Sequence, residues 1–262
     1  MASRFAVITG ASSGIGYNLA RVFAENGLDL VIGAEDGGIQ DAASQLQAFG
    51  VAVTPVQADL ATFDGCKQFW QQVESTGRKL DAIAINAGVG VGGLFAETDL
   101  EKEVNLVRLN CESTVHIAKY AVQKMIAQGE GKILITSSIA AEMVAPKEAV
   151  YAASKAFDLS FAKSLRYELK DSGVTVTALQ PGPTDTNFFE RADLGDTKAG
   201  TSGKKDSEPY DVAKQGFQAL MDGDEHVYSA SLTTKVQGAL AGLAPEALVA
   251  RMHEKMTEPA EK

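Results

Sequence analysis

Short apolar runs rich in β-branched residues alternate with stretches of helical periodicity along this chain of 262 residues. The alternation is the pattern of βαβ units, which stack into a parallel sheet covered by helices. We therefore expect one α/β domain over residues 1–262, with a doubly wound parallel sheet between two helical layers. The predicted strands cover 5–9, 28–33, 51–57, 80–85, 132–137, 174–180 and 226–229. The predicted helices cover 14–26, 37–49, 62–77, 98–128, 149–172, 209–222 and, near the C-terminus, 245–256.

Charge and composition exclude several classes of protein. The net charge of −10 repels a phosphate backbone, so neither nucleic acid nor an anionic membrane surface is expected as a partner. No apolar run reaches membrane-spanning length, and residues 1–4 lead into the first predicted strand without room for a signal peptide. We therefore expect a cytoplasmic protein. The 2 cysteines and 3 histidines lack metal-ligand spacing, so no metal site is predicted.

The connection 181–208 is much longer than the others and is punctuated by proline and glycine. A loop of that length in a compact domain is usually a lid or a disordered segment, and we predict that 188–208 is the substrate loop. Phe95 and the segment 139–146 are other candidate walls of a substrate site. The amphipathic helix 245–256 could cover the site or an oligomer interface, although plain packing against the domain is the simpler explanation.

A glycine-rich run, Thr9 to Gly16, joins the first predicted strand directly to the first helix. Glycines let the backbone approach a ligand closely, and the helix start offers unpaired N–H groups and a positive dipole end to a pyrophosphate. The spacing Gly-x-x-x-Gly-x-Gly differs from the commonest dinucleotide fingerprint, and a plain strand-to-helix turn is the alternative. The run stands in the first βα unit, where such a site belongs. Its candidate cofactor-binding residues are Gly10, Ser12, Ser13, Gly14, Ile15 and Gly16.

Tyrosine and lysine four residues apart, which share one face of a helix, occur three times in the chain. The pairs are Tyr120 with Lys124, Tyr151 with Lys155, and Tyr210 with Lys214. Only the second pair follows an apolar strand that ends in hydroxyl residues, Thr136, Ser137 and Ser138, and ligands of open parallel sheets bind beyond these ends. We predict that the second pair is catalytic and that the other two are partly buried rings with solvated lysines.

Tyr151 can donate a proton to a carbonyl oxygen, or remove one from an alcohol, if its pKa falls toward neutrality from about 10. An ammonium about 4 Å away stabilises the phenolate by about 4 kcal/mol at an effective dielectric constant of about 20, and desolvation opposes this. We therefore predict that Lys155 lowers the pKa of Tyr151. Ser138, or equally Ser137, can hydrogen-bond the substrate oxygen, with capping of the backbone as the alternative role.

With these residues assembled, the chain resembles the short-chain dehydrogenase/reductase family over about residues 4–230. The resemblance implies a Rossmann-type fold and hydride transfer between a nicotinamide cofactor and an alcohol/carbonyl pair. It also implies a homodimer or homotetramer built on the long helices 98–128 and 149–172. The matching residues are the glycine-rich run, Asn86, Ala87, Gly88, Asn110, Ser138, Tyr151, Lys155, Pro181 and Gly182.

The resemblance implies roles that spacing leaves open. It favours Ser138 over Ser137, because family members use the second serine of such a pair. Asn110 is implied to hold a water that joins the lysine to solvent, and Lys155 to bond the nicotinamide ribose as well. The other implied cofactor residues are Asn86, Ala87 and Gly88 on the adenosine side, Asp59 and Leu60 at the adenine, and Pro181, Gly182, Thr184 and Thr186 beside the nicotinamide amide.

The choice between NAD and NADP is expected to depend on the end of the second strand. NADP-dependent family members tend to carry an arginine at the position of Glu35 or a basic residue at that of Ser13, and this chain has neither. A carboxylate beside a 2′-phosphate is unfavourable, whereas Glu35 or Asp36 can accept hydrogen bonds from free ribose hydroxyls. NAD is therefore favoured over NADP, although NAD-specific members usually carry the acid one position earlier, at Ala34.

The sequence thus predicts an oxidoreductase that moves a hydride between a nicotinamide cofactor and a small alcohol, ketone or aldehyde. Tyr151 is the predicted general acid/base, assisted by Lys155, Ser138 and Asn110. One alternative is a catalytically idle cofactor-binding sensor or scaffold, against which the four intact residues argue. Another is a non-redox family member, such as a dehydratase or an epimerase.

Overall fold

Seven apolar runs pair side by side into one sheet within the described part of the computed structural model, residues 3–186, 188–192, 194–198, 208–229, 250–251, 253–255 and 257. The strands are β1 (Arg4–Thr9), β2 (Leu28–Ala34), β3 (Val53–Gln57), β4 (Ala82–Ile85), β5 (Gly131–Thr136), β6 (Val174–Pro181) and β7 (His226–Ser229). They lie in the order β3-β2-β1-β4-β5-β6-β7, and every neighbouring pair is parallel. The chain builds outward from β1 to β3 and then places β4 on the other side of β1, which confirms the predicted doubly wound sheet.

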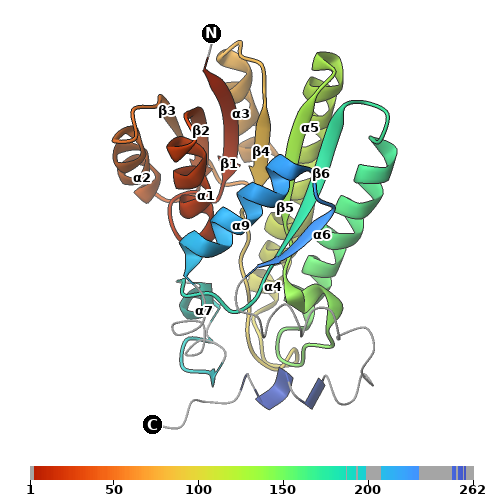
Figure 1. The fold of residues 1–262 in the computed structure, drawn as a ribbon. Helices are drawn as coiled ribbons and strands as arrows, with labels where there is room; N and C mark the ends of the chain where they lie inside the picture. Colours follow the sequence, from red (N-terminus) through yellow and green to blue (C-terminus); the bar gives the residue numbers. More distant parts are fainter. Residues whose placement is uncertain are drawn as a thin grey trace.

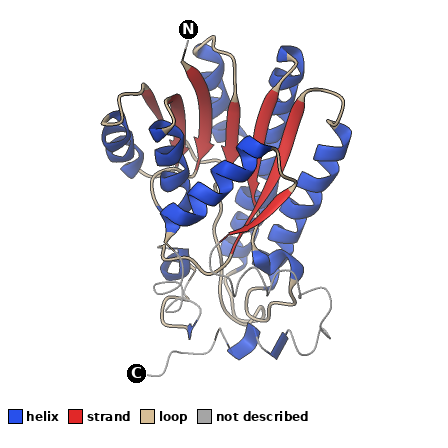
Figure 2. Cartoon of the chain, in the orientation of Figure 1, coloured by secondary structure: helices blue, strands red, loops and turns tan. Residues whose placement is uncertain are grey.

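Helices cover both faces of this sheet, so the domain has three layers (Figure 1 and Figure 2). One face carries α1 (Gly14–Glu25), α2 (Gly38–Gln47) and α9 (Pro209–Asp222). The other face carries α3 (Phe63–Ser75), α5 (Ser113–Gln128) and α6 (Ala149–Glu168). Two shorter helices, α4 (Leu100–Val107) and α7 (Phe188–Arg191), lie toward the carboxyl ends of the strands.

Two cores flank the sheet because neighbouring side chains along a strand point to opposite faces. Phe5 and Val7 of β1 belong to the core beneath α3, α5 and α6, while Ala6 and Ile8 belong to the core beneath α1, α2 and α9. All four are at most 2% exposed. A large apolar side chain contributes about 1.5–3 kcal/mol on burial, so the strands are held firmly and their carboxyl ends form a rigid edge.

The predicted helix over 98–128 is interrupted between α4 and α5. The chain makes one π-helical turn there, Arg108–Glu112, which inserts an extra residue into the helix. The hydroxyl of Thr114 donates to the carbonyl oxygen of Asn110 at 2.7 Å, so the widened turn retains a hydrogen-bond partner. The predicted span is therefore helical from residue 100 to 128, but the π-helical turn within it was not predicted, because a one-residue insertion barely disturbs the apolar periodicity.

The remaining strands and helices begin and end within a few residues of their predicted bounds. In the predicted substrate loop 188–208, residues 188–192, 194–198 and 208 belong to the described part, and the rest lies outside it. The predicted helix 245–256 lies largely outside the described residues, of which 250, 251 and 253–255 are helical. None of the helices in the described part is both long and apolar enough to cross a membrane.

Candidate functional site

The carboxyl ends of the strands border one long pocket, from the β1–α1 loop past β4 and β5 to the loop after β6. It lies where the strand order reverses, which is the usual ligand position in such a sheet. Asp59 and Asn110 do not line this pocket. The predicted site residues that line it are Gly10, Ser12, Ser13, Gly14, Ile15, Gly16, Glu35, Leu60, Asn86, Ala87, Gly88, Ser138, Tyr151, Lys155, Pro181, Gly182, Thr184 and Thr186.

The β1–α1 loop is shaped by the close approach of backbone segments. Gly10 has a φ of +69°, and a Cβ there would lie 2.8 Å from the Cα of Ala87. A Cβ at Gly16 would collide with the carbonyl oxygen of Gly10, so neither position accepts a side chain. Ser13 is the N-cap residue of α1, but its side chain does not cap the helix, and the first turn carries no acidic residue. The helix start therefore keeps its N–H groups and its positive dipole end for an anion.

Asn86, Ala87 and Gly88 are held in place by the end of β1. The Thr9 hydroxyl accepts hydrogen bonds from the N–H groups of Asn86 and Ala87 at 2.9 and 3.0 Å. The side-chain oxygen of Asn86 accepts from the Thr136 hydroxyl at 3.1 Å. These bonds tie the ends of β1, β4 and β5 together at the edge of the pocket.

The two candidate serines differ in their contacts. Ser137 is 2% exposed, and its hydroxyl donates to the carbonyl oxygen of Lys155 at 2.7 Å. The Ser138 hydroxyl accepts from the N–H of Ala140 at 3.1 Å and hydrogen-bonds the phenol of Tyr151. Ser137 therefore fastens α6 to the end of β5, and Ser138 is the serine that meets the tyrosine.

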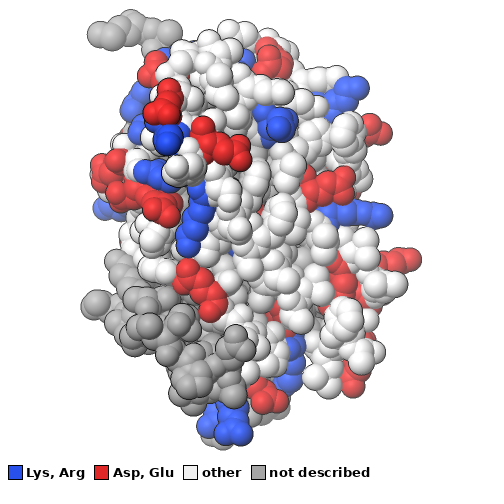
Figure 3. Space-filling view, turned by 90° about the vertical axis from the view of Figure 1, so that its right-hand side faces the viewer, with Lys and Arg blue, Asp and Glu red and all other residues white. Residues whose placement is uncertain are grey.

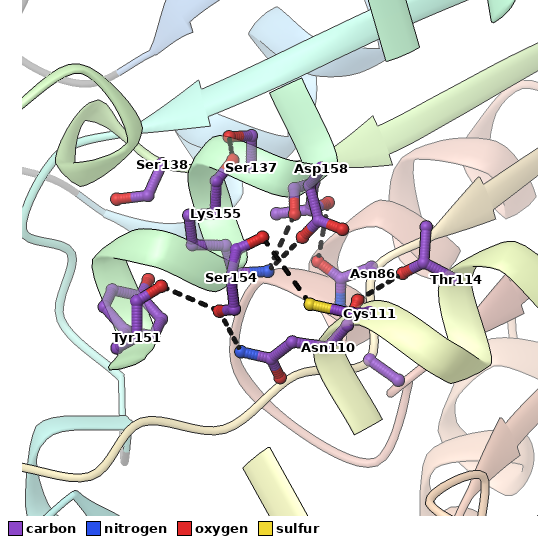
Figure 4. Close-up of polar contacts among 12 residues, drawn as sticks. Asn86, Asn110, Cys111, Thr114, Ser137, Ser138, Tyr151, Ser154, Lys155 and Asp158 are labelled. Carbon is purple, nitrogen blue, oxygen red and sulfur yellow. Dashed lines mark hydrogen bonds and ion pairs between the residues drawn. The ribbon is translucent and has the colours of Figure 1, made fainter. Parts of the chain in front are cut away.

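Tyr151 and Lys155 lie one turn apart on α6 at the pocket wall (Figure 4). Burial raises the pKa of the Tyr151 phenol above its ordinary value. The charge of Lys155 and the hydrogen bond with Ser138 lower this pKa, but they do not outweigh burial. The prediction of a lowered Tyr151 pKa is therefore wrong for this structure, because desolvation of the phenolate exceeds the stabilisation by the ammonium.

Lys155 is buried with an acidic neighbour that sequence reasoning did not single out. Its ammonium donates to the carbonyl oxygen of Thr136 and to the carboxylate of Asp158, each at 3.0 Å. Burial opposes the lysine charge, but Asp158 and Tyr151 together raise the Lys155 pKa above its ordinary value. The sequence signal that could have indicated this pair is the spacing of Lys155 and Asp158, since residues three apart share a helix face.

Asn110 is fully buried in the π-helical turn, beside the pocket. Its amide nitrogen donates to the carbonyl oxygen of Val89 at 3.0 Å and to the Ser154 hydroxyl at 2.9 Å. Its side-chain oxygen accepts from the N–H of Val89 at 3.0 Å. A Cβ at Gly88 would lie 3.1 Å from this oxygen and 3.4 Å from the Lys155 ammonium, so the space at Gly88 borders both polar groups.

Two carboxylates near the end of β2 have different surroundings. Asp36 accepts hydrogen bonds from the Ser12 hydroxyl at 2.8 Å and from the N–H of Gly38 at 2.9 Å. Glu35 lines the pocket, and its carboxylate makes no hydrogen bond or ion pair within the described part of the chain. Asp36 is thus fixed against the glycine-rich loop, and Glu35 is available to a ligand.

Asp59, which the resemblance implied at the adenine, does not reach the pocket. Its carboxylate accepts from the N–H of Ala61 at 2.9 Å and thereby fixes the turn that leads into α3. The neighbouring Leu60 does line the pocket, so only one residue of this pair is placed as expected.

The end of the pocket beside α7 has a mainly apolar wall with one hydrogen-bonded pair of polar side chains. The Phe188 ring of α7 lies 5.1 Å from that of Tyr151. Glu148 and His253 are both less than 10% exposed, and their side chains meet at 2.9 Å. Lys147, just before Glu148, has a φ of +67°, a strained conformation that no other non-glycine residue of the described part adopts. Sequence reasoning missed this pair, because nothing in the local pattern links residues so far apart.

The other two tyrosine–lysine pairs do not border the pocket. The ring of Tyr120 stacks on that of Trp70, with 5.4 Å between the centroids. The Tyr210 hydroxyl donates to the carboxylate of Glu25 at 2.8 Å. Both rings therefore have packing roles, and it is the preceding strand, not the spacing, that distinguishes Tyr151.

Known proteins resemble this chain in sequence and in structure. A family model described as short chain dehydrogenase matches residues 4–196. The 1-deoxy-11-beta-hydroxypentalenate dehydrogenase of Streptomyces exfoliatus is 34% identical over 233 residues, 87% of this chain and 84% of that protein. A short-chain dehydrogenase from Sphingobium yanoikuyae, solved with NADPH, is 28% identical with a TM-score of 0.78 over 92% of this chain and 94% of that one. A short chain dehydrogenase/reductase from Burkholderia phymatum, solved with NAD, has the same fold, with a TM-score of 0.80 at 22% identity over 99% of this chain and 98% of that one.

Proposed function

Since this chain belongs to the short-chain dehydrogenase family, we propose that it transfers a hydride between a nicotinamide cofactor and an alcohol/carbonyl pair. One observation carries the proposal. Ser138, Tyr151 and Lys155 converge at one end of a pocket whose other end is the glycine-rich loop. A catalytically idle binding protein has no need of a hydroxyl, a phenol and an ammonium gathered at one end of that pocket.

The residues of the pocket fit a dinucleotide. Gly10 and Gly16 let the β1–α1 loop fold closely against neighbouring backbone, which leaves the uncapped start of α1 facing a pyrophosphate. Asn86 to Gly88 and Leu60 would form the adenosine wall. Residues of the loop after β6, Pro181, Gly182, Thr184 and Thr186, would hold the nicotinamide amide. When bound, the nicotinamide supplies or accepts the hydride.

The position of Tyr151 indicates which group gives or takes the proton. In the reductive direction its phenol donates to the carbonyl oxygen, and in the oxidative direction its phenolate removes the proton from the alcohol. Ser138 bonds the same substrate oxygen and holds it against the phenol. Lys155 stabilises the phenolate and directs its remaining N–H to the cofactor ribose. Phe188, 5.1 Å from the tyrosine ring, supports the proposal that α7 covers this end of the site.

Asn110 supports the lysine through a water. Its side-chain oxygen accepts one hydrogen bond, from Val89, and a carbonyl oxygen has two lone pairs. The space at Gly88 borders this oxygen and the Lys155 ammonium. A water in that space would join the two groups and lead from the lysine toward solvent.

NAD is the proposed cofactor. An adenosine 2′-phosphate would meet the carboxylate of Glu35 beside the fixed carboxylate of Asp36, whereas free ribose hydroxyls can donate to Glu35. Titration of the purified protein with NADH and with NADPH, followed by energy transfer from Trp70, tests this choice. Tighter binding of NADPH contradicts it, and binding of neither contradicts the enzyme proposal as a whole.

The reaction is tested by a screen of alcohols with NAD and of ketones and aldehydes with NADH. Formation or loss of NADH absorbance is the expected result. Conversion of substrate without a change in NADH identifies a non-redox reaction, such as dehydration or epimerisation. The matched control is Tyr151→Phe, which keeps the ring and removes the proton donor.

We also propose a homo-oligomer formed through the face of α4 and α6. A groove between the π-helical turn and the start of α6 is lined by Phe95, Val107, Cys111, Ala149, Val150, Ala153 and Ser154. Figure 3, which views the molecule from the side of α6, shows broad areas without charged side chains. Exposed apolar residues there include Val104, Val107 and Phe157. Sedimentation of the wild type and of Val107→Glu is the test, with a monomeric wild type as the contrary result.

A further inference from the structure

A carboxylate is buried directly behind the lysine of the site. Asp158 is 0% exposed and lies on α6, three residues after Lys155. One oxygen of this carboxylate lies 3.0 Å from the Lys155 ammonium, which also donates to the carbonyl oxygen of Thr136. Figure 4 shows the lysine between two groups of side chains, with Tyr151 and Ser138 on one side and Asp158 and Thr114 on the other.

Lys155 is the one cation that pairs with Asp158 within the described part of the chain. The hydroxyl of Thr114, on α5, lies near the carboxylate and donates its proton to the carbonyl oxygen of Asn110. The second carboxylate oxygen of Asp158 has no hydrogen-bond partner among the described residues. A buried carboxylate without a cation is strongly unfavourable, so the position of Asp158 depends on the charge of Lys155.

Few other ionisable groups face this pair. From the π-helical turn comes Cys111, whose thiol is neutral near pH 7 because burial raises its pKa to about 11. From the start of α6 comes Glu148, which is paired with His253 of the C-terminal segment. The remaining group is the phenol of Tyr151, which the lysine and both carboxylates influence. Asp158 is therefore the principal charge that offsets the lysine.

The negative charge of Asp158 changes the effect of Lys155 on the pKa of Tyr151. Lys155 lowers the pKa of Tyr151, and the negative charge of Asp158 raises it again. Asp158 also opposes the effect of burial on Lys155 and so keeps the lysine in its ammonium form. With two of its three N–H groups bonded to Thr136 and Asp158, the ammonium is left with one N–H to direct elsewhere.

We propose that Asp158 is the counter-ion of Lys155 and, acting through it, sets the pH range in which Tyr151 exchanges its proton. Asp158 is a positioning residue, since it contacts the lysine and not the substrate. The inference rests on the proposed role of Tyr151 as the general acid/base.

The sign of the effect does not depend on which group loses its proton. With Asp158 ionised, the protonated tyrosine and the charged lysine form a site of zero net charge with the carboxylate. Without the carboxylate the same site carries one positive charge, and loss of a proton from either Tyr151 or Lys155 relieves it. The first ionisation of the site must therefore move to lower pH.

The test substitutions are Asp158→Asn and, as a matched control, Asp171→Asn. Asparagine keeps the shape of the side chain and an oxygen for the lysine, and Asp171 is an exposed carboxylate just after the end of α6. The pH dependence of kcat for alcohol oxidation is measured for both. The expected result is an inflection about one pH unit or more lower in Asp158→Asn, the size of effect that a neighbouring charge has at a partly buried site. No displacement is expected in Asp171→Asn.

A second measurement does not need turnover. Ionisation of Tyr151 is followed by the near-ultraviolet absorbance of the phenolate, as the difference between each protein and its Tyr151→Phe counterpart. A folded Asp158→Asn protein whose inflection stays in place, or moves to higher pH, overturns the inference. If no substrate reacts at all, the proposed function fails, and the absorbance titration still decides the role of Asp158.

Asp158→Glu covers the case in which the asparagine variant does not fold. It keeps the negative charge on a longer side chain, so the inflection should stay within a few tenths of a pH unit of the wild type even if stability falls. A displacement as large as that expected for Asp158→Asn would show that the charge is not the controlling property, and it would overturn the inference.

Discussion

Gly10→Ala should weaken cofactor binding as well as stability, whereas Gly27→Ala should reduce stability alone. Both glycines have left-handed φ angles, +69° and +75°. A Cβ at Gly27 meets no atom within 4 Å, but one at Gly10 lies 2.8 Å from the Cα of Ala87. Gly27 therefore controls for the backbone strain that the two substitutions share.

The expected magnitudes follow from these two geometries. An L-residue in the left-handed region costs about 1–2 kcal/mol, and the reduced freedom of the unfolded chain returns about 0.4–1 kcal/mol. Gly27→Ala should thus lower the free energy of unfolding by about 1 kcal/mol, or the Tm by about 2–4 °C. The contact with the Ala87 backbone adds about 1–3 kcal/mol at Gly10, because a backbone atom yields only if the loop moves. The total for Gly10→Ala is therefore about 2–4 kcal/mol.

Thermal unfolding and titration with NADH separate the two effects. Movement of the loop away from Ala87 displaces the N–H groups at the start of α1, so Gly10→Ala should bind NADH at least about tenfold more weakly, about 1.4 kcal/mol. Gly27→Ala should bind NADH as the wild type does. Equal NADH affinity in the two variants would refute the reasoning that this loop holds the pyrophosphate, and equal Tm values would refute the steric argument.

Three other substitutions test the site. Tyr151→Phe should reduce kcat by about 10²–10⁴-fold and abolish the rise of alcohol oxidation with pH. This rise lies on the alkaline side because burial raises the Tyr151 pKa. The control Tyr120→Phe should keep the wild-type kcat and the wild-type rise with pH. Glu35→Arg should raise the ratio of NADP to NAD affinity about tenfold or more, and an unchanged ratio contradicts the role given to this carboxylate. Ser137→Ala should cost about 1 kcal/mol of stability, because it frees a buried carbonyl oxygen, and should keep kcat. Ser138→Ala should lower kcat as well as stability, because its hydroxyl also accepts from the N–H of Ala140, and the reverse outcome in kcat would exchange the two roles.

Much of the fold could be predicted because its signals are local. Runs such as Val7 and Ile8 on β1 are apolar on both faces, as expected for a strand buried between two helical layers. The glycine-rich loop and the strand before Tyr151 could be placed for the same reason, since each is a contiguous pattern beside a predicted strand end. The π-helical turn could not be predicted, because it depends on hydrogen bonds such as that from Thr114 to the Asn110 carbonyl oxygen.

The rest of the site depends on long-range packing. His253 meets Glu148 only after the C-terminal segment has returned to the pocket, and no spacing rule links them. Asp158 looks in sequence like any polar residue of an amphipathic helix, and its burial is decided by the neighbours of α6. The pKa of Tyr151 was predicted with the wrong sign for a related reason: the charge of Lys155 is visible in the sequence, but the amount of solvent lost by the phenol is not.

The π-helical turn makes the number of residues in this segment as important as their identity. An α-helix advances about 100° per residue, so deleting one residue within Arg108–Glu112 would restore a regular helix and rotate α4 by about that angle relative to α5. Either Asn110 would then leave Val89, or the apolar side of α4 would turn away from its present direction. Single-residue deletions here should therefore be far less tolerated than substitutions at its half-exposed position, Cys111. A scan of deletions beside a scan of substitutions would make this constraint on chain length visible.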